Sequence, residues 1–131
     1  MATERAFLDT HVAYWLAGGS PSLSSRALSS INSFGLRVIS SITLVELSMK
    51  SRRGLGSISD LASGFESVGI HVEDFTAEDA MNFGRFAALD GHDPFDRMLL
   101  AQAARISGTT FFTADRVILG LGLDWVVDAA G

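Results

Sequence analysis

Five acidic residues could together hold a metal ion: Asp9, Glu46, Asp93, Asp96 and Asp115. Two of them follow short apolar runs that resemble buried strands, two open a helix, and Glu46 lies within an otherwise apolar helix. Clustered carboxylates repel one another and raise one another's pKa, so a folded site that gathers four or five of them needs a cation. Ligation by oxygen alone suits a hard ion, Mg²⁺ or Mn²⁺. The residue types therefore predict a divalent metal site if the fold brings them together.

Short apolar segments alternate with helical patterns along the chain. The expected strands cover residues 6–8, 37–39, 70–72, 110–113 and, as a short fifth strand, 124–127. The expected helices cover residues 11–16, 21–35, 41–53, 57–69, 76–89 and 93–107. This alternation predicts an α/β fold with a mainly parallel sheet. Ligand sites in such sheets lie beyond the carboxyl ends of the strands, where Asp9 and Asp115 are expected.

The composition is that of a compact domain. The chain has 131 residues, of which 47% are hydrophobic and 19% charged, so we expect one domain over residues 1–131. The chain contains no cysteine, which excludes a disulfide scaffold, a thiolate zinc site and cysteine nucleophilic catalysis. No apolar run approaches the roughly 18 residues that a membrane span needs, and we expect a cytoplasmic protein without membrane attachment.

The net charge also bears on the choice of substrate. A formal charge of −5 is opposite in sign to that of proteins that bind nucleic acid through bulk electrostatics. The five candidate ligands carry five negative charges, so the rest of the chain sums to zero. With metal bound, the protein therefore need not repel a phosphodiester.

Each acid also has an ordinary structural explanation. Three stand where a side chain could cap a helix or a turn: Asp9, Asp93 and Asp115. Asp96, at the third helical position, could complement the helix dipole. Glu46 could form an ion pair with Lys50 four residues later. The capping interpretation and the metal interpretation both remain open at this level.

Four segments resemble the PIN-domain ribonuclease family and, within it, the VapC-like toxins of bacterial toxin–antitoxin pairs. They are Phe-Leu-Asp-Thr at 7–10, Ser-Ile-Thr-Leu-Val-Glu-Leu at 41–47, Asp-Pro-Phe-Asp-Arg and its continuation at 93–103, and Phe-Thr-Ala-Asp at 112–115. They run in the family's order, and the Asp-Pro-Phe-Asp-Arg block is the most specific. The resemblance implies a three-layer α/β/α fold with a central, mainly parallel sheet of four to five short strands.

The resemblance also assigns roles to individual residues. It implies that four acids are catalytic and hold Mg²⁺ or Mn²⁺: Asp9, Glu46, Asp96 and Asp115. Asp93 would be an accessory metal ligand, and Thr10 and Thr113 would support the site. Arg97 and Arg116 stand beside ligand positions and are candidates for contacts to RNA phosphates, although ion pairs with the acids explain them equally well. His92, next to Asp93, could touch the site, but we expect it to be a structural or surface histidine.

The sequence thus predicts a metal-dependent endoribonuclease that hydrolyses RNA phosphodiester bonds and acts as the toxin of a toxin–antitoxin pair. The resemblance implies a cognate antitoxin protein as partner and a homodimer. The alternative from a different functional class is a non-catalytic binding module with the same fold, whose acids serve only as helix caps. Metal binding distinguishes the two, because a ligated ion stabilises the folded protein by mass action.

Overall fold

A five-stranded parallel sheet forms the centre of the molecule. The structure is a computed structural model that describes residues 4–50 and 57–131. The strands are β1 (Arg5–Leu8), β2 (Leu36–Ser40), β3 (His71–Glu73), β4 (Thr109–Thr113) and β5 (Val126–Asp128). Their order across the sheet is β3-β2-β1-β4-β5, and every neighbouring pair is parallel. Each predicted strand is present to within two residues.

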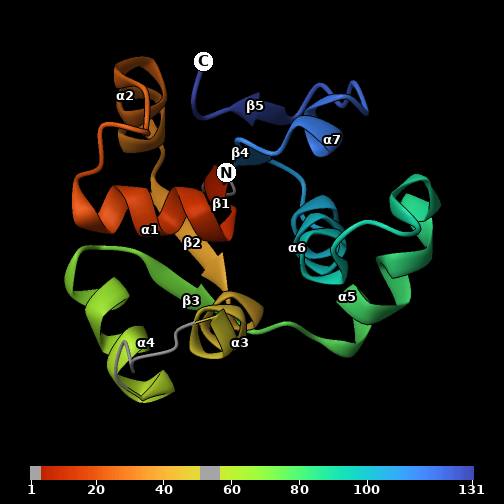
Figure 1. The fold of residues 1–131 in the computed structure, drawn as a ribbon, viewed down its shortest axis with the longest axis horizontal. Helices are drawn as coiled ribbons and strands as arrows, with labels where there is room; N and C mark the ends of the chain where they lie inside the picture. Colours follow the sequence, from red (N-terminus) through yellow and green to blue (C-terminus); the bar gives the residue numbers. More distant parts are fainter. Residues whose placement is uncertain (1–3, 51–56) are drawn as a thin grey trace.

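The helices cover both faces of this sheet (Figure 1). They are α1 (Thr10–Gly18), α2 (Ser25–Ser33), α3 (Ser41–Lys50), α4 (Ile58–Ser67), α5 (Ala77–Met81), the 3₁₀ segment η1 (Asn82–Leu89), α6 (Pro94–Ala104) and α7 (Arg116–Leu119). Helices α1, α2 and α4 lie on one side, and α5 and α6 lie on the other. In the described part of the chain, no helix is both long and apolar enough to cross a membrane.

Each face of the sheet has its own hydrophobic core, because successive side chains of a strand point to opposite faces. Ala6 and Leu8 of β1 pack with α1, α2 and α4, whereas Phe7 between them packs with α6 and η1. All four residues of β1 are buried, as expected for the central strand of a parallel sheet. The predicted three-layer α/β fold is therefore confirmed.

One predicted helix begins later than the sequence pattern indicates. The helix expected from Pro21 starts at Ser25, and Ser24 is its N-cap, with Oγ accepting a hydrogen bond from the Ala27 amide at 3.0 Å. Residues 20–23 instead form a turn closed by the Leu23 amide on the Ser20 carbonyl. Ser24 provides the cap, and Pro21 lies in the turn before it.

The helix predicted over 76–89 is divided. After α5 the chain continues as η1, with a non-helical residue at Phe86. Arg97 of α6 donates a hydrogen bond from Nε to the Phe83 carbonyl at 2.9 Å, and Asn82 donates from its side chain to the Ala101 carbonyl. These contacts to α6 hold the segment in the tighter conformation. The predicted end of the helix over 41–53 lies outside the described residues beyond position 50.

Candidate metal centre

The carboxyl ends of the central strands place acidic side chains around one cavity. Asp9 ends β1 and is the N-cap of α1, and Asp115 follows β4 and is the N-cap of α7. Because β1 and β4 are neighbouring parallel strands, paired in register at Leu8 and Phe112, these two acids lie at the same edge of the sheet. The cavity has a volume of about 450 Å³ and is lined by Asp9, His11, Trp15, Glu46, Lys50, His92, Asp93, Asp96, Ala114 and Asp115.

Asp9 lies at the floor of the cavity and is held by neutral donors. Its Oδ1 accepts a hydrogen bond from the Thr10 amide at 2.8 Å, and its Oδ2 accepts one from the Thr113 hydroxyl at 2.6 Å. The Thr113 hydroxyl in turn accepts a hydrogen bond from the Asp115 amide at 3.0 Å. Burial raises the pKa of Asp9, and these hydrogen bonds only partly oppose that effect. Asp9 is thus oriented by two neutral groups.

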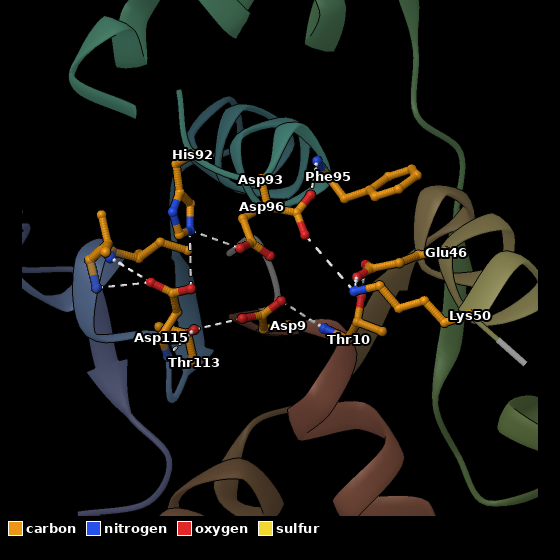
Figure 2. Close-up of polar contacts among 12 residues, drawn as sticks. Asp9, Thr10, Glu46, Lys50, His92, Asp93, Phe95, Asp96, Thr113 and Asp115 are labelled. Atoms are coloured by element: carbon orange, nitrogen blue, oxygen red, sulfur yellow. Dashed lines mark hydrogen bonds and ion pairs between the residues drawn. The ribbon is translucent and has the colours of Figure 1, made fainter. Parts of the chain in front are cut away.

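Glu46 reaches the cavity from α3 and is only 2% exposed. Its Oε1 accepts a hydrogen bond from the Thr10 hydroxyl, and its Oε2 accepts one from Lys50 Nζ, each at 2.6 Å. The ion pair with Lys50 that the sequence suggested is therefore present. Lys50 also faces Asp93, with its Nζ 3.9 Å from Asp93 Oδ2 (Figure 2). It therefore forms ion pairs both within α3 and across the cavity.

Three further ligand atoms meet on the other side of the cavity. His92 Nε2 lies 3.0 Å from Asp96 Oδ2 and 3.1 Å from Asp115 Oδ2 (Figure 2). One ligand atom from each of these residues lies within 4.8 Å of the others, a spacing that suits a shared metal ion. Although burial lowers the pKa of His92, the two carboxylates outweigh it and raise that pKa. His92 was expected to be a surface or structural residue, but it lies in the site.

The electrostatics of the cluster indicate a shortage of positive charge. Burial, together with the nearby carboxylates of Asp9, Asp93, Asp115 and Glu46, raises the pKa of Asp96 to about 7. Burial also acts to raise the pKa of Asp115, but backbone amides of α7 and His92 lower it overall. A carboxyl group that retains its proton near neutral pH marks a place where a cation is favoured. Oxygen donors in this number fit a hard divalent ion such as Mg²⁺ or Mn²⁺.

The structure brings together most of the residues singled out from the sequence. All five acids line the cavity, and Thr10 and Thr113 orient two of them. Capping and convergence occur together, because the cap residues of three helices all line this cavity: Asp9, Asp93 and Asp115. Capping alone requires no such convergence.

The two candidate arginines are placed elsewhere. Arg97 is buried, stacks on the Phe83 ring with its guanidinium carbon 4.0 Å from the ring centroid, and forms an ion pair with Asp90. Arg116 is exposed and pairs with Asp128 at 2.9 Å. Neither lines the cavity, and their contacts with RNA phosphates stay a prediction. The basic and aromatic residues in the lining are instead His11, Trp15, Lys50 and His92.

The comparisons with known proteins agree with this geometry. Residues 6–121 match the family described as PIN domain. The chain belongs to the PIN domain family. Comparison with curated protein sequences found no match.

Solved structures similar to this PIN domain include chains from bacterial complexes. A DNA-bound VapBC from Salmonella typhimurium is 23% identical, with a TM-score of 0.66 and coverage of 95% of this chain and 98% of the other. VapBC2 from Rickettsia felis, bound to a promoter DNA fragment, is 18% identical, with a TM-score of 0.63 and coverage of 95% and 96%. A toxin–antitoxin complex from Klebsiella pneumoniae is 15% identical, with a TM-score of 0.63 and coverage of 93% and 95%. At these identities the comparison supports the fold of this PIN domain.

Proposed function

We propose that this PIN domain is a divalent-metal-dependent endoribonuclease. The observation that supports this most is the convergence of four carboxylates, from segments far apart in the sequence, on one cavity: Asp9, Glu46, Asp96 and Asp115. Asp93 would be an accessory ligand at the rim. The choice of RNA as the substrate rests on the resemblance of these motifs to PIN-domain ribonucleases.

Each residue of the proposed metal site has its own role. A bound Mg²⁺ or Mn²⁺ supplies an activated water and neutralises charge on the phosphodiester. Thr113 and Thr10 orient Asp9 and Glu46 through their hydroxyl groups, which fixes the two buried ligands. Asp96 would give up its proton to bind a cation, whose positive charge opposes the burial and the neighbouring carboxylates that raise its pKa. Attack of water on phosphorus with loss of the 3′ oxygen leaves 5′-phosphate and 3′-hydroxyl ends.

The protein would act as the toxin of a toxin–antitoxin pair in the cytoplasm, as a homodimer. The complexes named for the similar structures support an antitoxin partner. An apolar groove of about 280 Å³ lies between α1, α3 and α4 and suits an amphipathic segment of such a partner. A basic residue of the antitoxin would then complement the acidic cavity.

A non-catalytic binding module is the second candidate. Two observations favour it: three of the acids cap helices, and Glu46 already has Lys50 as a partner. In that case the acids would serve the fold alone. The two candidates differ in their response to metal.

The deciding experiment is cleavage of a mixed RNA pool in the presence of Mn²⁺, Mg²⁺ or EDTA. Wild type is compared with Asp9→Asn and Asp96→Asn, and Asp124→Asn is the matched control because Asp124 is exposed and does not line the cavity. We expect metal-dependent cutting that is lost in the first two variants and kept in the control. Absence of cutting together with absence of metal-induced thermal stabilisation would favour the binding module.

A further inference from the structure

Helix α1 presents two aromatic side chains to the acidic cavity. His11 and Trp15 are four residues apart, so they lie on one face of the helix that begins at Asp9. Their ring centroids are 6.3 Å apart and their planes are inclined by 42°. His11 is exposed and Trp15 is half-buried, and both line the cavity that contains the carboxylates. The cavity therefore has an acidic floor and an aromatic rim.

The two tryptophans of the chain differ in their surroundings. Trp125 packs edge-on against Phe86, with ring centroids 6.4 Å apart, at the core on the other face of the sheet. Trp15 rests against the core beneath α1 but also borders the cavity. Packing alone explains Trp125. Trp15 combines such packing with a place in the lining of the carboxylate cavity.

A nucleotide combines two chemical parts that match the two parts of this cavity. Its phosphate carries the charge that a metal-loaded carboxylate cluster would bind, and its base is a flat aromatic ring. Aromatic side chains stack on nucleobases with little dependence on which base is present. Tryptophan has the largest flat surface for this purpose and carries no charge that would repel the phosphates.

We propose that Trp15, with His11 at its edge, forms a nucleobase-stacking subsite next to the carboxylate cluster. This inference rests on the proposed RNA cleavage and deepens it by assigning the base beside the bound phosphodiester to α1. Lys50 lies on α3 at the Glu46 and Asp93 side of the cavity. The aromatic rim and this ammonium group would thus contact different parts of the same substrate.

The first test uses the fluorescence of Trp15. A Trp125→Phe background leaves Trp15 as the sole tryptophan, and Asp96→Asn prevents cleavage while removing one negative charge. The protein is titrated with tetra-adenylate and with an abasic ribose-phosphate tetramer in the presence of Mg²⁺. We expect saturable quenching by tetra-adenylate and binding of the abasic tetramer that is weaker by a factor of about five or more.

Substitutions at position 15 provide the second test, with binding followed by the anisotropy of labelled tetramers. Trp15→Leu should bind both tetramers with equal affinity, whereas Trp15→Phe, which retains a ring, should still prefer the one with bases. Tyr14→Leu is the matched control, because Tyr14 is an exposed aromatic residue of α1 that lies outside this cavity. It should bind as the parent protein does.

The outcomes separate the subsite from the nuclease. Equal quenching by the two tetramers, no saturable quenching, or an unchanged base preference in Trp15→Leu would overturn the subsite even if wild type cuts RNA. Base-dependent quenching in a protein that cuts no RNA would support the subsite and reject the nuclease. The two proposals can therefore fail independently.

Discussion

Asp79 and Asp9 are both buried acids, but the groups that donate hydrogen bonds to them differ in charge. Asp79 of α5 is fully buried and accepts hydrogen bonds from Arg105 Nε at 2.5 Å and from the Thr76 amide at 2.8 Å. Asp9 is buried nearly as well, but its partners are a threonine hydroxyl and a backbone amide. An acid that serves the fold is paired with a full positive charge. Asp9, in the cavity, is instead oriented by neutral groups.

The same contrast holds beyond these two residues. Away from the cavity, Arg5 pairs with Glu73 and Arg97 pairs with Asp90. Within the cavity, the ion pairs of the carboxylates in the described part of the chain are formed with Lys50 and His92. Unpaired buried charge costs stability, so a fold keeps such a cluster only where its charge has a use.

The largest effect is expected from removing a charge in the cavity. Asp9→Asn should lower metal-dependent RNA cleavage by a factor of about 100 or more, because a principal ligand is lost. Its free energy of unfolding should stay within about 1 kcal/mol of wild type or rise, since the substitution relieves repulsion and asparagine also caps helices. Initial cleavage rates and urea unfolding without metal measure the two effects. If folded Asp9→Asn cuts RNA at the wild-type rate, Asp9 is not a ligand that the cleavage requires.

Removing the charge of Asp79, which pairs with Arg105, should lower stability and leave cleavage unchanged. Asp79→Asn leaves Arg105 without its buried partner and should lower the free energy of unfolding by about 2–3 kcal/mol. Cleavage by the fraction that remains folded should match wild type. Urea unfolding gives the stability change, and Glu78→Gln is the control because Glu78 contacts the same arginine from an exposed position. If Asp79→Asn and Glu78→Gln lower the free energy of unfolding equally, the buried Asp79–Arg105 pair has no special role in stability.

The pH dependence of stability tests the shortage of positive charge directly. The pKa of Asp96 is about 7 in the folded protein against an ordinary value of 3.8, so the folded state binds the proton more tightly than the unfolded state. Without metal, the contribution of Asp96 to stability should be large near pH 4 and fall by roughly 3 kcal/mol as the pH rises to 7. The raised pKa of His92 acts in the same direction at the upper end of this range.

Urea unfolding in EDTA between pH 4 and 8 measures this change. Asp96→Asn should flatten the profile, and Mg²⁺ or Mn²⁺ should restore stability at neutral pH by binding the folded state. A profile that is equally steep in wild type and Asp96→Asn would show that Asp96 is not its source.

The smallest effect is expected at Lys50, the cation that resides in the cavity. Lys50→Gln should increase the affinity for Mn²⁺ by a factor of about two to five, because an ammonium group no longer competes for Glu46. Lys50→Arg, which keeps the charge, should bind the metal as wild type does. Isothermal titration calorimetry measures both affinities. Weaker metal binding by Lys50→Gln would mean that the lysine supports the site rather than competing for it.

Local patterns predicted the strands and the acids at their ends because both depend on neighbouring residues. The run 6–8 has to be a buried strand, and the residue after such a strand lies at the edge of the sheet. Asp93 followed by Pro94 marks a helix start without any tertiary information, and the structure has that cap.

What the sequence missed depends on contacts between distant segments. His92 precedes α6 and meets Asp115 only because α6 and the end of β4 are packed together. The division of the helix over 76–89 requires Arg97 to take the carbonyl of Phe83, which is fourteen residues earlier. A signal for His92 was present in its spacing of four residues from Asp96, but that spacing alone does not tell a ligand from a surface residue.

The N-cap positions of three cavity acids bear on how this protein can evolve. Asparagine caps a helix about as well as aspartate, so Asp→Asn at positions 9, 93 or 115 removes a charge from the cavity without removing the cap. Such a change requires a single base substitution in the codon. A lineage that loses the proposed activity in this way keeps its fold and its surface, including the apolar groove. Loss of the proposed activity is therefore one mutation away, and the helix caps survive that mutation.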